Sequence, residues 1–593
     1  MLDEAKEKLQ HHFGYETFLN GQENILHHVM QRQSVLGIMP TGGGKSVCYQ
    51  IPSLLLPGIT VVISPLISLM KDQVDEAREA GIPATFINSS LSYDEMQEQM
   101  DSLRRGECRL LYVAPERLSN QEFLRQLQSI PVSLTAVDEA HCLSQWGHDF
   151  RPAYMEIPKF LSFTGSDTAV LALTATATPQ VAQDISHALD IPPDQMVKTG
   201  FARENLTFSV VKGQNREAYI IDYVKKRKQH PGIIYANTRK EVEKLWEMLH
   251  KEGIAVEKYH GGMEPAEREL AQERFVYDEV TVMAATTAFG MGINKSNVRF
   301  VLHARMPRNI ESYYQEAGRA GRDGDPGDCT LLFSPQDAGT HQFLIDQSHL
   351  DEERKDKEYR KLRQMIHYCH TEDCLQNEML RYFGEEPQEP CGRCLNCTDD
   401  RTLEDVTEEA QMVFSCVKRM RERFGKVMTA QVLAGSSNEK IRTLNLHTLP
   451  TYGLMKNRTQ KDVAAFIDFL AAHAYLSLSD GAYPVLTLTN AAIDVLRGTD
   501  RVMRKETLTA ETVSSEDPLF EEMRQLRLHL AKQHGVAPYM VFSDKTLKEF
   551  CRHLPQEESE MMEIKGVGRQ KLETYGEPFL EVLQRAAAGK VKS

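Results

Sequence analysis

The sequence has no long hydrophobic run. No stretch of eighteen or more consecutive apolar residues occurs in the 593-residue chain, and its start lacks the charged and then apolar segment of a secretory signal. With neither feature, we expect a soluble, cytoplasmic protein that does not enter a membrane. Apolar residues make up 41% of the chain, which is enough for ordinary globular cores. At roughly 150 residues per domain, the length predicts about four domains.

The chain also lacks a positive net charge. Its formal net charge is -15 at pH 7. Net charge describes the whole surface rather than any one groove, so a basic groove can lie on an acidic body. The sign of the charge therefore carries little weight for or against a nucleic-acid partner.

Cysteine is too sparse for a disulfide framework, with eleven in the chain. Most stand singly and are expected to be small buried apolar side chains. Four are grouped, one of them upstream of a C-x2-C-x2-C run: Cys374, Cys391, Cys394 and Cys397. Four thiolates at this spacing can close a tetrahedral structural zinc site. Disulfide pairing is disfavoured in a cytosolic chain, and iron–sulfur ligation is an alternative that the spacing leaves open.

What the sequence has is alternation. From residue 1 to about 335, short apolar runs alternate with helical patterns, and the runs are nearly continuous in apolar residues, as in strands buried on both faces of a parallel sheet. The runs lie at 35–39, 60–63, 110–113, 134–137 and 170–173, and then at 232–235, 281–284, 300–303 and 330–333. This pattern predicts two α/β domains in tandem, divided near residues 201–205.

The remainder is more helical. Residues 340–398 are charged and helical in pattern, and 405–424 predict an amphipathic helix that is locally basic. That helix suits duplex phosphates, although a solvated helix face explains the same charges. A polar linker at 507–518 precedes a last small helical unit.

The first apolar run leads into a glycine-rich loop and then a helical pattern over 47–56. A strand, a glycine loop and a helix N-terminus together cradle phosphates. Lys45 would reach the β and γ phosphates and Ser46 would ligate magnesium. The predicted nucleotide-binding loop is Thr41, Gly42, Gly43, Gly44, Lys45 and Ser46. Met39 stands where the usual loop has glycine, and an ordinary glycine turn is the alternative.

A carboxylate pair follows another apolar run. Asp138 is placed to hold magnesium, and Glu139 to orient or deprotonate the attacking water. A solvated turn would also explain two acidic residues, but the phosphate loop upstream argues against it.

The second α/β domain supplies two arginines. Arg319 and Arg322 are three residues apart, and a helical turn would place them on one face. Their permanently charged, planar groups suit a developing phosphoryl charge. We predict Arg322 as an arginine finger with Arg319 beside it, and Gln315 precedes both. A charged helix end is the alternative.

These motifs together resemble a superfamily-2 helicase core. The matching segments are Thr-Gly-Gly-Gly-Lys-Ser (41–46), Ser64 to Gln73, Asp-Glu-Ala-His (138–141), Leu173 to Ala177, Phe289 to Ile293 and Gln315 to Gly324. Within that superfamily the chain closely resembles RecQ helicases, on Phe13-Gly-Tyr15 with Phe18 and Gln22, the aromatic stretch after His141, and the cysteine cluster.

The resemblance implies an α/β fold class. It consists of two tandem RecA-like parallel-sheet domains, a helical zinc-binding module, a winged helix and a small all-α HRDC domain. The expected ranges are 1–204, 205–337, 338–400, 401–508 and 516–593. A glycine-containing segment at 564–571 in the last domain could bind phosphate, or could be a plain helix–helix turn.

The resemblance also assigns contacts. Tyr15 is expected to stack on adenine and Gln22 to hydrogen-bond its edge. Leu19 replaces the arginine usual before that glutamine, which puts a second stacking group in doubt. The aromatic loop is expected to bind DNA through Trp146, His148, Phe150 and Arg151, because bases stack on exposed aromatic rings. Packing in the core is an equal alternative for Phe150 and Tyr154.

The function implied is an ATP-dependent 3′ to 5′ DNA helicase that unwinds duplex or branched DNA in recombination, repair and replication-fork maintenance. Its cofactors would be ATP, Mg²⁺ and Zn²⁺. Its partners would be single-stranded and branched DNA, with single-stranded-DNA-binding protein a candidate. We expect a cytoplasmic, nucleoid-associated monomer. The alternatives are a double-stranded DNA translocase, an RNA helicase, a non-catalytic adaptor and a nuclease fusion, although no unassigned carboxylate cluster supports the last.

Overall fold

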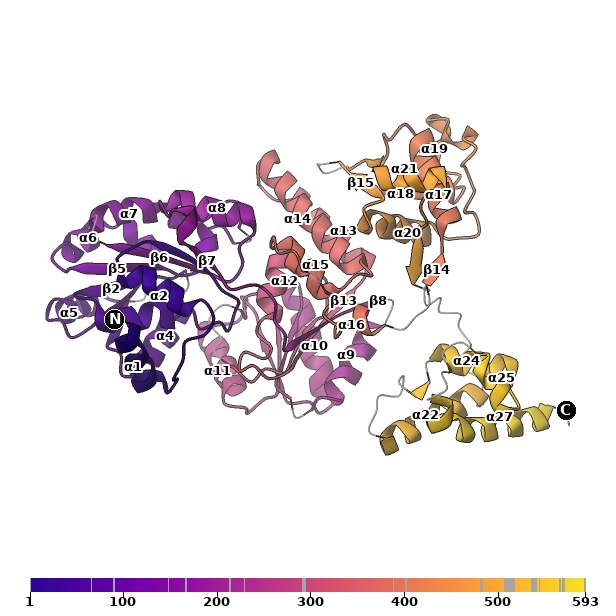
Figure 1. Cartoon of the computed structure of the whole chain (residues 1–593), viewed down its shortest axis with the longest axis horizontal. Coiled ribbons are helices and arrows are strands. Elements are labelled where there is room, and N and C mark those ends of the chain that lie inside the picture. Colours follow the sequence, from indigo (N-terminus) through magenta and orange to yellow (C-terminus); the bar gives the residue numbers. More distant parts are fainter. Residues whose placement is uncertain are drawn as a thin grey trace. The chain divides into compact units, whose positions relative to one another are not determined.

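The structure is a computed structural model of the chain (Figure 1). It describes residues 2–590 except 66, 89–90, 148, 166–167, 213–214, 229, 291–294, 388, 400–402, 480–483, 506–517, 535–540, 543, 565–566 and 568–570. The predicted contact of His148, the linker at 507–517 and most of the segment 564–571 therefore lie outside the described residues. Two compact units are present, residues 1–505 and 506–593.

The first sheet has seven strands in the order β3-β4-β2-β5-β6-β1-β7, all paired in parallel. The strands are β1 (Val35–Ile38), β2 (Ile59–Ile63), β3 (Ala84–Ile87), β4 (Leu110–Val113), β5 (Val132–Val137), β6 (Ala169–Thr174) and β7 (Met196–Lys198). The central strands are buried because helices cover both faces. Because the strands are all parallel, the loops that follow them emerge at the same edge of the sheet.

Helices cover the first sheet as Figure 1 shows, with α7 and α8 on one side and α2 and α4 on the other. The helices are α1 (Leu2–Phe13), α2 (Gln22–Met30), α3 (Val47–Leu55), α4 (Ile67–Glu79), α5 (Tyr93–Arg104), α6 (Gln121–Leu127), α7 (Ile157–Thr164) and α8 (Pro179–Ala188). A short 3-10 turn, η2 (Ala140–Leu143), follows the carboxylate pair.

The second sheet has six parallel strands in the order β10-β11-β9-β12-β13-β8. The strands are β8 (Leu206–Lys212), β9 (Gly232–Tyr235), β10 (Val256–Tyr259), β11 (Val282–Ala285), β12 (Phe300–His303) and β13 (Gly327–Phe333). The helices are α9 (Arg216–Lys225), α10 (Arg239–Lys251), α11 (Pro265–Val276) and α12 (Ile310–Ala317). These two sheets confirm the predicted pair of α/β domains.

Four helices follow the second sheet: α13 (Pro335–Asp346), α14 (Glu352–His370), α15 (Leu375–Tyr382) and α16 (Leu395–Thr398). Buried side chains of α14 and α15 belong to the same hydrophobic core as both sheets. The zinc-binding module is therefore packed into the body of the larger unit.

A separate core belongs to the following helical region. Its elements are α17 (Thr407–Arg419), α18 (Lys426–Leu433), α19 (Glu439–Thr443), α20 (Gln460–Ala472), α21 (Asn490–Arg497) and the antiparallel pairs β14 (Leu403–Asp405) with β17 (Met503–Lys505) and β15 (Leu476–Leu478) with β16 (Leu486–Leu488). The helix predicted over 405–424 is wrong at both ends. Residue 405 belongs to β14, and the helix ends at Arg419 because Arg421 and Glu422 have φ of 57° and 54°.

The smaller unit is helical, with α22 (Pro518–His534), α24 (Asp544–His553), α25 (Glu558–Met562) and α27 (Glu577–Lys590). Phe542, Phe550 and Phe579 form its aromatic centre. Among the described residues, no helix is long and apolar enough to span a bilayer.

Candidate ATP and DNA site

The glycine loop connects β1 to α3. The Met39 N–H donates to the carbonyl of Thr174 at 3.0 Å, which extends the pairing with β6 up to the loop. Gly42 and Gly44 then have φ of +85° and +66°, a region that glycine enters without strain. The chain turns into α3 at Val47, so the helix N-terminus faces the loop. This is the strand–loop–helix arrangement that a phosphate cradle needs.

The Lys45 side chain folds over its own loop. Its ammonium lies 3.4 Å from the carbonyl oxygens of Met39 and Pro40. Burial lowers the pKa of Lys45, while Glu139 and Asp138 act in the opposite direction. The cation is thus held between backbone carbonyls and the carboxylate pair, close to where phosphates would enter.

The carboxylate pair follows β5 at the same edge of the sheet. The Tyr154 hydroxyl donates to the backbone carbonyl of Asp138 at 2.9 Å, and the Gln73 amide lies 3.5 Å from the Asp138 carboxylate. Burial and the neighbouring Glu139 raise the pKa of Asp138. Tyr154 is fully buried. Of the two roles considered for Tyr154 from the sequence, the structure shows packing in the core.

Glu139 is held by His141. The imidazole Nδ1 lies 3.2 Å from Glu139 Oε2 and 3.0 Å from the Thr174 hydroxyl. Burial alone would raise the pKa of Glu139, but the hydrogen bond and charge of His141 outweigh it and lower that pKa. The carboxylate is therefore ionised at neutral pH, as an acceptor of a proton from water must be.

The arginine pair lies in turns and not on a helix, so the expected helical turn is wrong. Helix α12 ends at Ala317, where Gly318 caps it, and Gly321 has φ of +56°. The chain nevertheless brings the arginines to the first domain. A Cβ built on Gly42 would lie 3.7 Å from the backbone of Arg322.

The side chain of Arg319 is buried, and that of Arg322 is half-buried. Burial, and after it the charge of Arg319, lowers the pKa of Arg322 to about 9, so it stays protonated at pH 7. Among the described residues, Nε and Nη1 of Arg319 have no hydrogen-bond partner. Buried cationic donors of this kind suit an anion. Gln315 is half-buried on α12, one turn before them.

At the adenine end, Tyr15 and Leu19 are exposed at 64% and 54%. Gln22 is buried, and its amide nitrogen donates to the carbonyl of Gly44 at 2.9 Å, while its oxygen accepts from the Leu19 N–H at 2.8 Å. The amide thus joins the glycine loop to the Leu19 segment. The adenine contacts of Tyr15 and Gln22 stay predictions.

The aromatic loop packs against α14. Trp146 is half-buried, with the ammonium of Lys357 at 4.1 Å and the guanidinium of Arg360 at 5.3 Å from its ring centre. Phe150 has Arg354 at 5.6 Å from its ring centre. Arg151 donates to the carbonyl of Pro65 at 2.6 Å. The aromatic rings of the loop therefore lie against cations of α14, and the DNA contacts of the loop stay predictions.

The four grouped cysteines converge. Their sulfurs lie within 4.8 Å of one another, and the Cys394–Cys397 and Cys391–Cys397 pairs are 3.4 and 3.9 Å apart. All are free thiols, which excludes disulfides among them. Tetrahedral zinc with Zn–S of about 2.3 Å holds its sulfurs about 3.8 Å apart. The donor set and spacing therefore fit a structural zinc ion.

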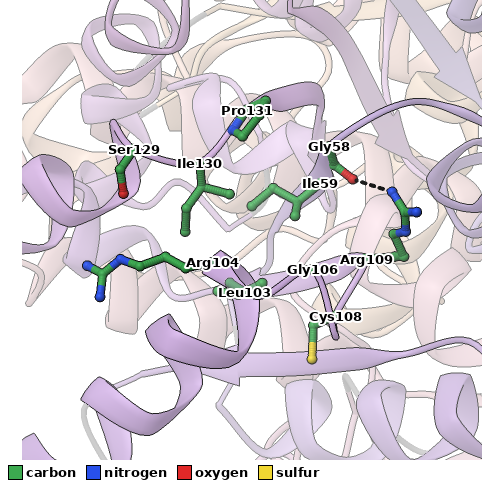
Figure 2. Close-up of a pocket in the computed structure, with 10 residues that line it drawn as sticks. All are labelled: Gly58, Ile59, Leu103, Arg104, Gly106, Cys108, Arg109, Ser129, Ile130 and Pro131. Carbon is green, nitrogen blue, oxygen red and sulfur yellow. Dashed lines mark hydrogen bonds between the residues drawn. The ribbon is translucent and has the colours of Figure 1, made fainter.

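A cavity of about 240 Å³ opens at the amino-terminal ends of β2, β4 and β5 (Figure 2). Arg109 lines one side of it and donates to the carbonyl of Gly58 at 3.2 Å. The glycine loop and carboxylate pair follow the carboxyl ends of the strands, so this cavity has no part in the site.

Two further cations contact the site, and neither belongs to a sequence motif. Arg203 donates to the carbonyl of Thr41 at 2.6 Å. Lys361 donates to the carbonyl of Trp146 at 2.7 Å and lies 3.4 Å from Glu311. A single lysine or arginine outside a motif cannot be recognised as a site residue from the sequence, so only the folded structure shows these two contacts.

Family models match nearly the whole chain. They are a DEAD/DEAH box helicase (20–185), a helicase conserved C-terminal domain (215–324), a RecQ zinc-binding domain (335–398), an RQC domain (400–512) and an HRDC domain (516–583). Among solved structures, the DUF1998 helicase MrfA bound to DNA matches with a TM-score of 0.50 and 17% identity over 64% of this chain and 55% of that one, which shows a shared fold alone.

Full-length relatives are similar as well. The chain is 51% identical to the ATP-dependent DNA helicase RecQ of Bacillus subtilis, covering 99% of both chains. It is 38% identical to the RecQ of Haemophilus influenzae, over 97% of this chain and 95% of that one. With such identity over its whole length and matching domains in order, the chain belongs to the RecQ helicase family.

Proposed function

We propose that the chain is an ATP-dependent DNA helicase that translocates 3′ to 5′ on single-stranded DNA and unwinds duplex and branched DNA in recombination, repair and replication-fork maintenance. The observation that supports this proposal most directly is that the glycine loop and the carboxylates of one parallel-sheet domain lie next to the arginines of the other. The relatives named above are ATP-dependent DNA helicases. The direction rests on family resemblance.

Hydrolysis would use residues from both domains. Thr41, Gly42, Gly43, Gly44 and Lys45 bind the phosphates, and Ser46 and Asp138 hold the magnesium ion, which neutralises charge on the phosphates. Glu139 accepts the proton of the attacking water. Arg319 and Arg322 stabilise the charge that develops on the transferred phosphoryl group, with Gln315 supporting them.

Because the arginines come from the second domain, hydrolysis depends on how the domains meet. ATP binding favours the arrangement in which the two sheet domains are in contact. Hydrolysis then removes the γ-phosphate that Arg319 and Arg322 would bind, so the domains can separate. Repeated closing and opening would step the chain along a single strand. Each base-pair step opened costs about 1.4 kcal/mol of duplex stacking.

DNA would regulate this cycle through the aromatic loop. The loop begins three residues after His141, which holds Glu139. A base stacking on Trp146 would displace the cations of α14, and the change would reach Glu139 through η2. Arg151 and Phe150 would contribute phosphate or stacking contacts. Zinc at the four cysteines would stabilise the module that carries α14.

Domain limits at 204, 337, 400 and 508 and action as a cytoplasmic, nucleoid-associated monomer are part of this proposal, as is single-stranded-DNA-binding protein as a partner. A non-catalytic adaptor is disfavoured because Lys45, Glu139 and both arginines are present together.

The test is the ATP hydrolysis rate with and without single-stranded DNA, in magnesium buffer. We expect strong stimulation by DNA and much weaker stimulation by RNA of the same length. No hydrolysis, or hydrolysis indifferent to DNA, would overturn the proposal, and preferential stimulation by RNA would favour an RNA helicase. Stimulation by double-stranded DNA alone would favour a duplex translocase.

A further inference from the structure

The segment between the two parallel sheets is contacted from three directions. It follows β7 and leads into β8, so it joins the sheets covalently. The Tyr314 hydroxyl of α12 donates to the carbonyl of Phe201 at 2.9 Å, and the ring of Phe201 stacks on Phe383 at 4.3 Å. Glu385 accepts the Phe201 N–H at 2.9 Å. This connecting segment is therefore an ordered junction where the two sheet domains meet.

Arg203 lies at the centre of this junction. One of its terminal nitrogens donates to the carbonyl of Thr41, at 2.6 Å, in the glycine loop. The other donates to the carbonyls of Gly321 and Ala320 at 3.0 and 3.3 Å. One planar cation therefore joins the phosphate loop of the first domain to the turn that carries Arg322 in the second. A guanidinium can hold both carbonyls at once, which a lysine ammonium on a flexible stem cannot do with the same geometry.

The zinc-binding module holds the same segment from the other side. Arg393 stands between the ligand cysteines Cys391 and Cys394, so its backbone is fixed by the cluster. Its guanidinium donates to the carbonyls of Arg203 and Leu206, at 3.2 Å each. Its third partner, Gln376 on α15, lies at 2.6 Å. The cysteine cluster is thus two side chains away from the phosphate loop.

We propose that Arg203 is a positioning residue for ATP hydrolysis, and that Arg393 couples it to the zinc-binding module. When the two sheet domains are in contact, Arg203 sets the spacing between the Thr41 carbonyl and the Gly321 carbonyl, and through the next peptide it sets the position of Arg322 relative to the glycine loop. Arg393 fixes the backbone from which Arg203 extends. This inference rests on the proposed ATPase function.

The first test is Arg203→Gln, which keeps an amide donor but loses the charged fork. We expect kcat for DNA-stimulated hydrolysis to fall about tenfold or more, because the charge-assisted hydrogen bonds that join the Thr41 carbonyl to the turn carrying Arg322 are lost. The Kd of a fluorescent non-hydrolysable ATP analogue should change less than about threefold, since the phosphate contacts stay. Arg203→Lys should recover only part of kcat.

Arg227→Gln is the matched control. Arg227 is also half-buried, and its guanidinium donates to the carboxylate of Asp328 at the start of β13. It should leave kcat unchanged, and the thermal midpoints of both variants should agree within a few degrees. If Arg203→Gln has the kcat of the wild type, or loses kcat only in proportion to a lower thermal midpoint, the inference is wrong.

The second test is a double-mutant cycle with Arg393→Gln. Residues that act in series are non-additive, so the double variant should have about the kcat of Arg203→Gln alone. Zinc content, measured by metal analysis, should stay at one ion per chain in all variants. Multiplied losses of kcat would overturn the coupling through Arg393, as would loss of zinc from Arg393→Gln.

Failure of the proposed function would be recognised separately. A wild-type chain that does not hydrolyse ATP with DNA would refute the ATPase proposal itself. A wild type that hydrolyses ATP, beside an Arg203→Gln variant that does so equally well, would refute only the positioning role.

Discussion

Asp138 and Glu139 are adjacent in the site, but the groups around them shift their pKa values in opposite directions. Asp138 has burial and the charge of Glu139 against its ionised form, whereas Glu139 has His141 beside it. Glu139 is therefore ionised at neutral pH and can accept a proton, while a magnesium ion bound beside Asp138 would favour the ionised form of that carboxyl.

Glu139→Gln tests the role of this acceptor. The amide has nearly the same shape but cannot take a proton, and a general base contributes roughly 10²–10⁴-fold to rate. We expect kcat for ATP hydrolysis to fall at least about 100-fold, with affinity for ATP kept within a few fold. Steady-state hydrolysis and equilibrium nucleotide binding measure the two quantities. Normal turnover in this variant would remove Glu139 from the mechanism.

Arg322→Ala tests the cation supplied by the second domain. Arginine fingers contribute roughly 10³–10⁵-fold to kcat, so a loss of about 10³-fold is expected with little change in nucleotide affinity. Arg299→Ala is the control, because Arg299 pairs with Asp323 beside the same turn without facing the glycine loop. Equal losses of kcat in both variants would mean that the turn is merely destabilised.

At the scale of elements, the aromatic loop and α14 form a pair. Lys357 and Arg360 cover the Trp146 ring, and Lys361 donates to its backbone carbonyl. These cations cover one side of the Trp146 ring. If the loop moved away from α14, the ring would be free for a nucleic-acid base to stack on. The loop thus has the composition of a single-strand binding surface.

Trp146→Ala tests this element. Stacking on an aromatic ring contributes about 1–3 kcal/mol per base, so affinity for single-stranded DNA should fall roughly 5- to 150-fold. Hydrolysis without DNA should change little. The other tryptophan supplies the control, because Trp246 on α10 packs against His250 and Lys258. Unchanged DNA affinity in Trp146→Ala, or an equal loss in Trp246→Ala, would contradict the assignment.

Cys394→Ser tests the cysteine cluster. The fully buried Cys394 sulfur lies against Cys374 and Cys397, and its loss opens a four-ligand site. We expect zinc content to fall well below one per chain and the thermal midpoint to drop by about 5 °C or more, since structural zinc contributes folding energy. Cys416→Ser, a buried cysteine in the next domain, should keep its zinc. Full zinc content in Cys394→Ser would contradict the site.

The strands of the two parallel sheets that sequence patterns missed share one property. The predicted apolar runs match the central strands, whereas β3 and β7 are the edges of the first sheet and β10 and β8 those of the second. An edge strand is buried on fewer sides, so β10, with the sequence Val-Glu-Lys-Tyr, has no continuous apolar run. Continuous apolar runs in the sequence therefore predict the central strands of a parallel sheet but not its edge strands.

The whole molecule brings together residues that no local pattern connects. The glycine loop, the carboxylates and the cysteine cluster each have a local motif, and sequence alone predicted all three. The contact of Arg203 with Thr41, 162 residues away in sequence, has none. Nor could sequence show that Gln22 binds the glycine loop or that the arginines lie in turns, because packing and chain reversal decide both.

The proposed function requires that ATP hydrolysis between the two sheet domains drives strand separation in one direction. The most direct measurement is unwinding of 3′-tailed against 5′-tailed duplex DNA of equal length, with ATP and magnesium. We expect rapid separation of the 3′-tailed duplex, little separation of the 5′-tailed one, and no separation of either by the Glu139→Gln variant. Preference for the 5′ tail would contradict the direction, and normal hydrolysis with no unwinding of either duplex would contradict the proposed function.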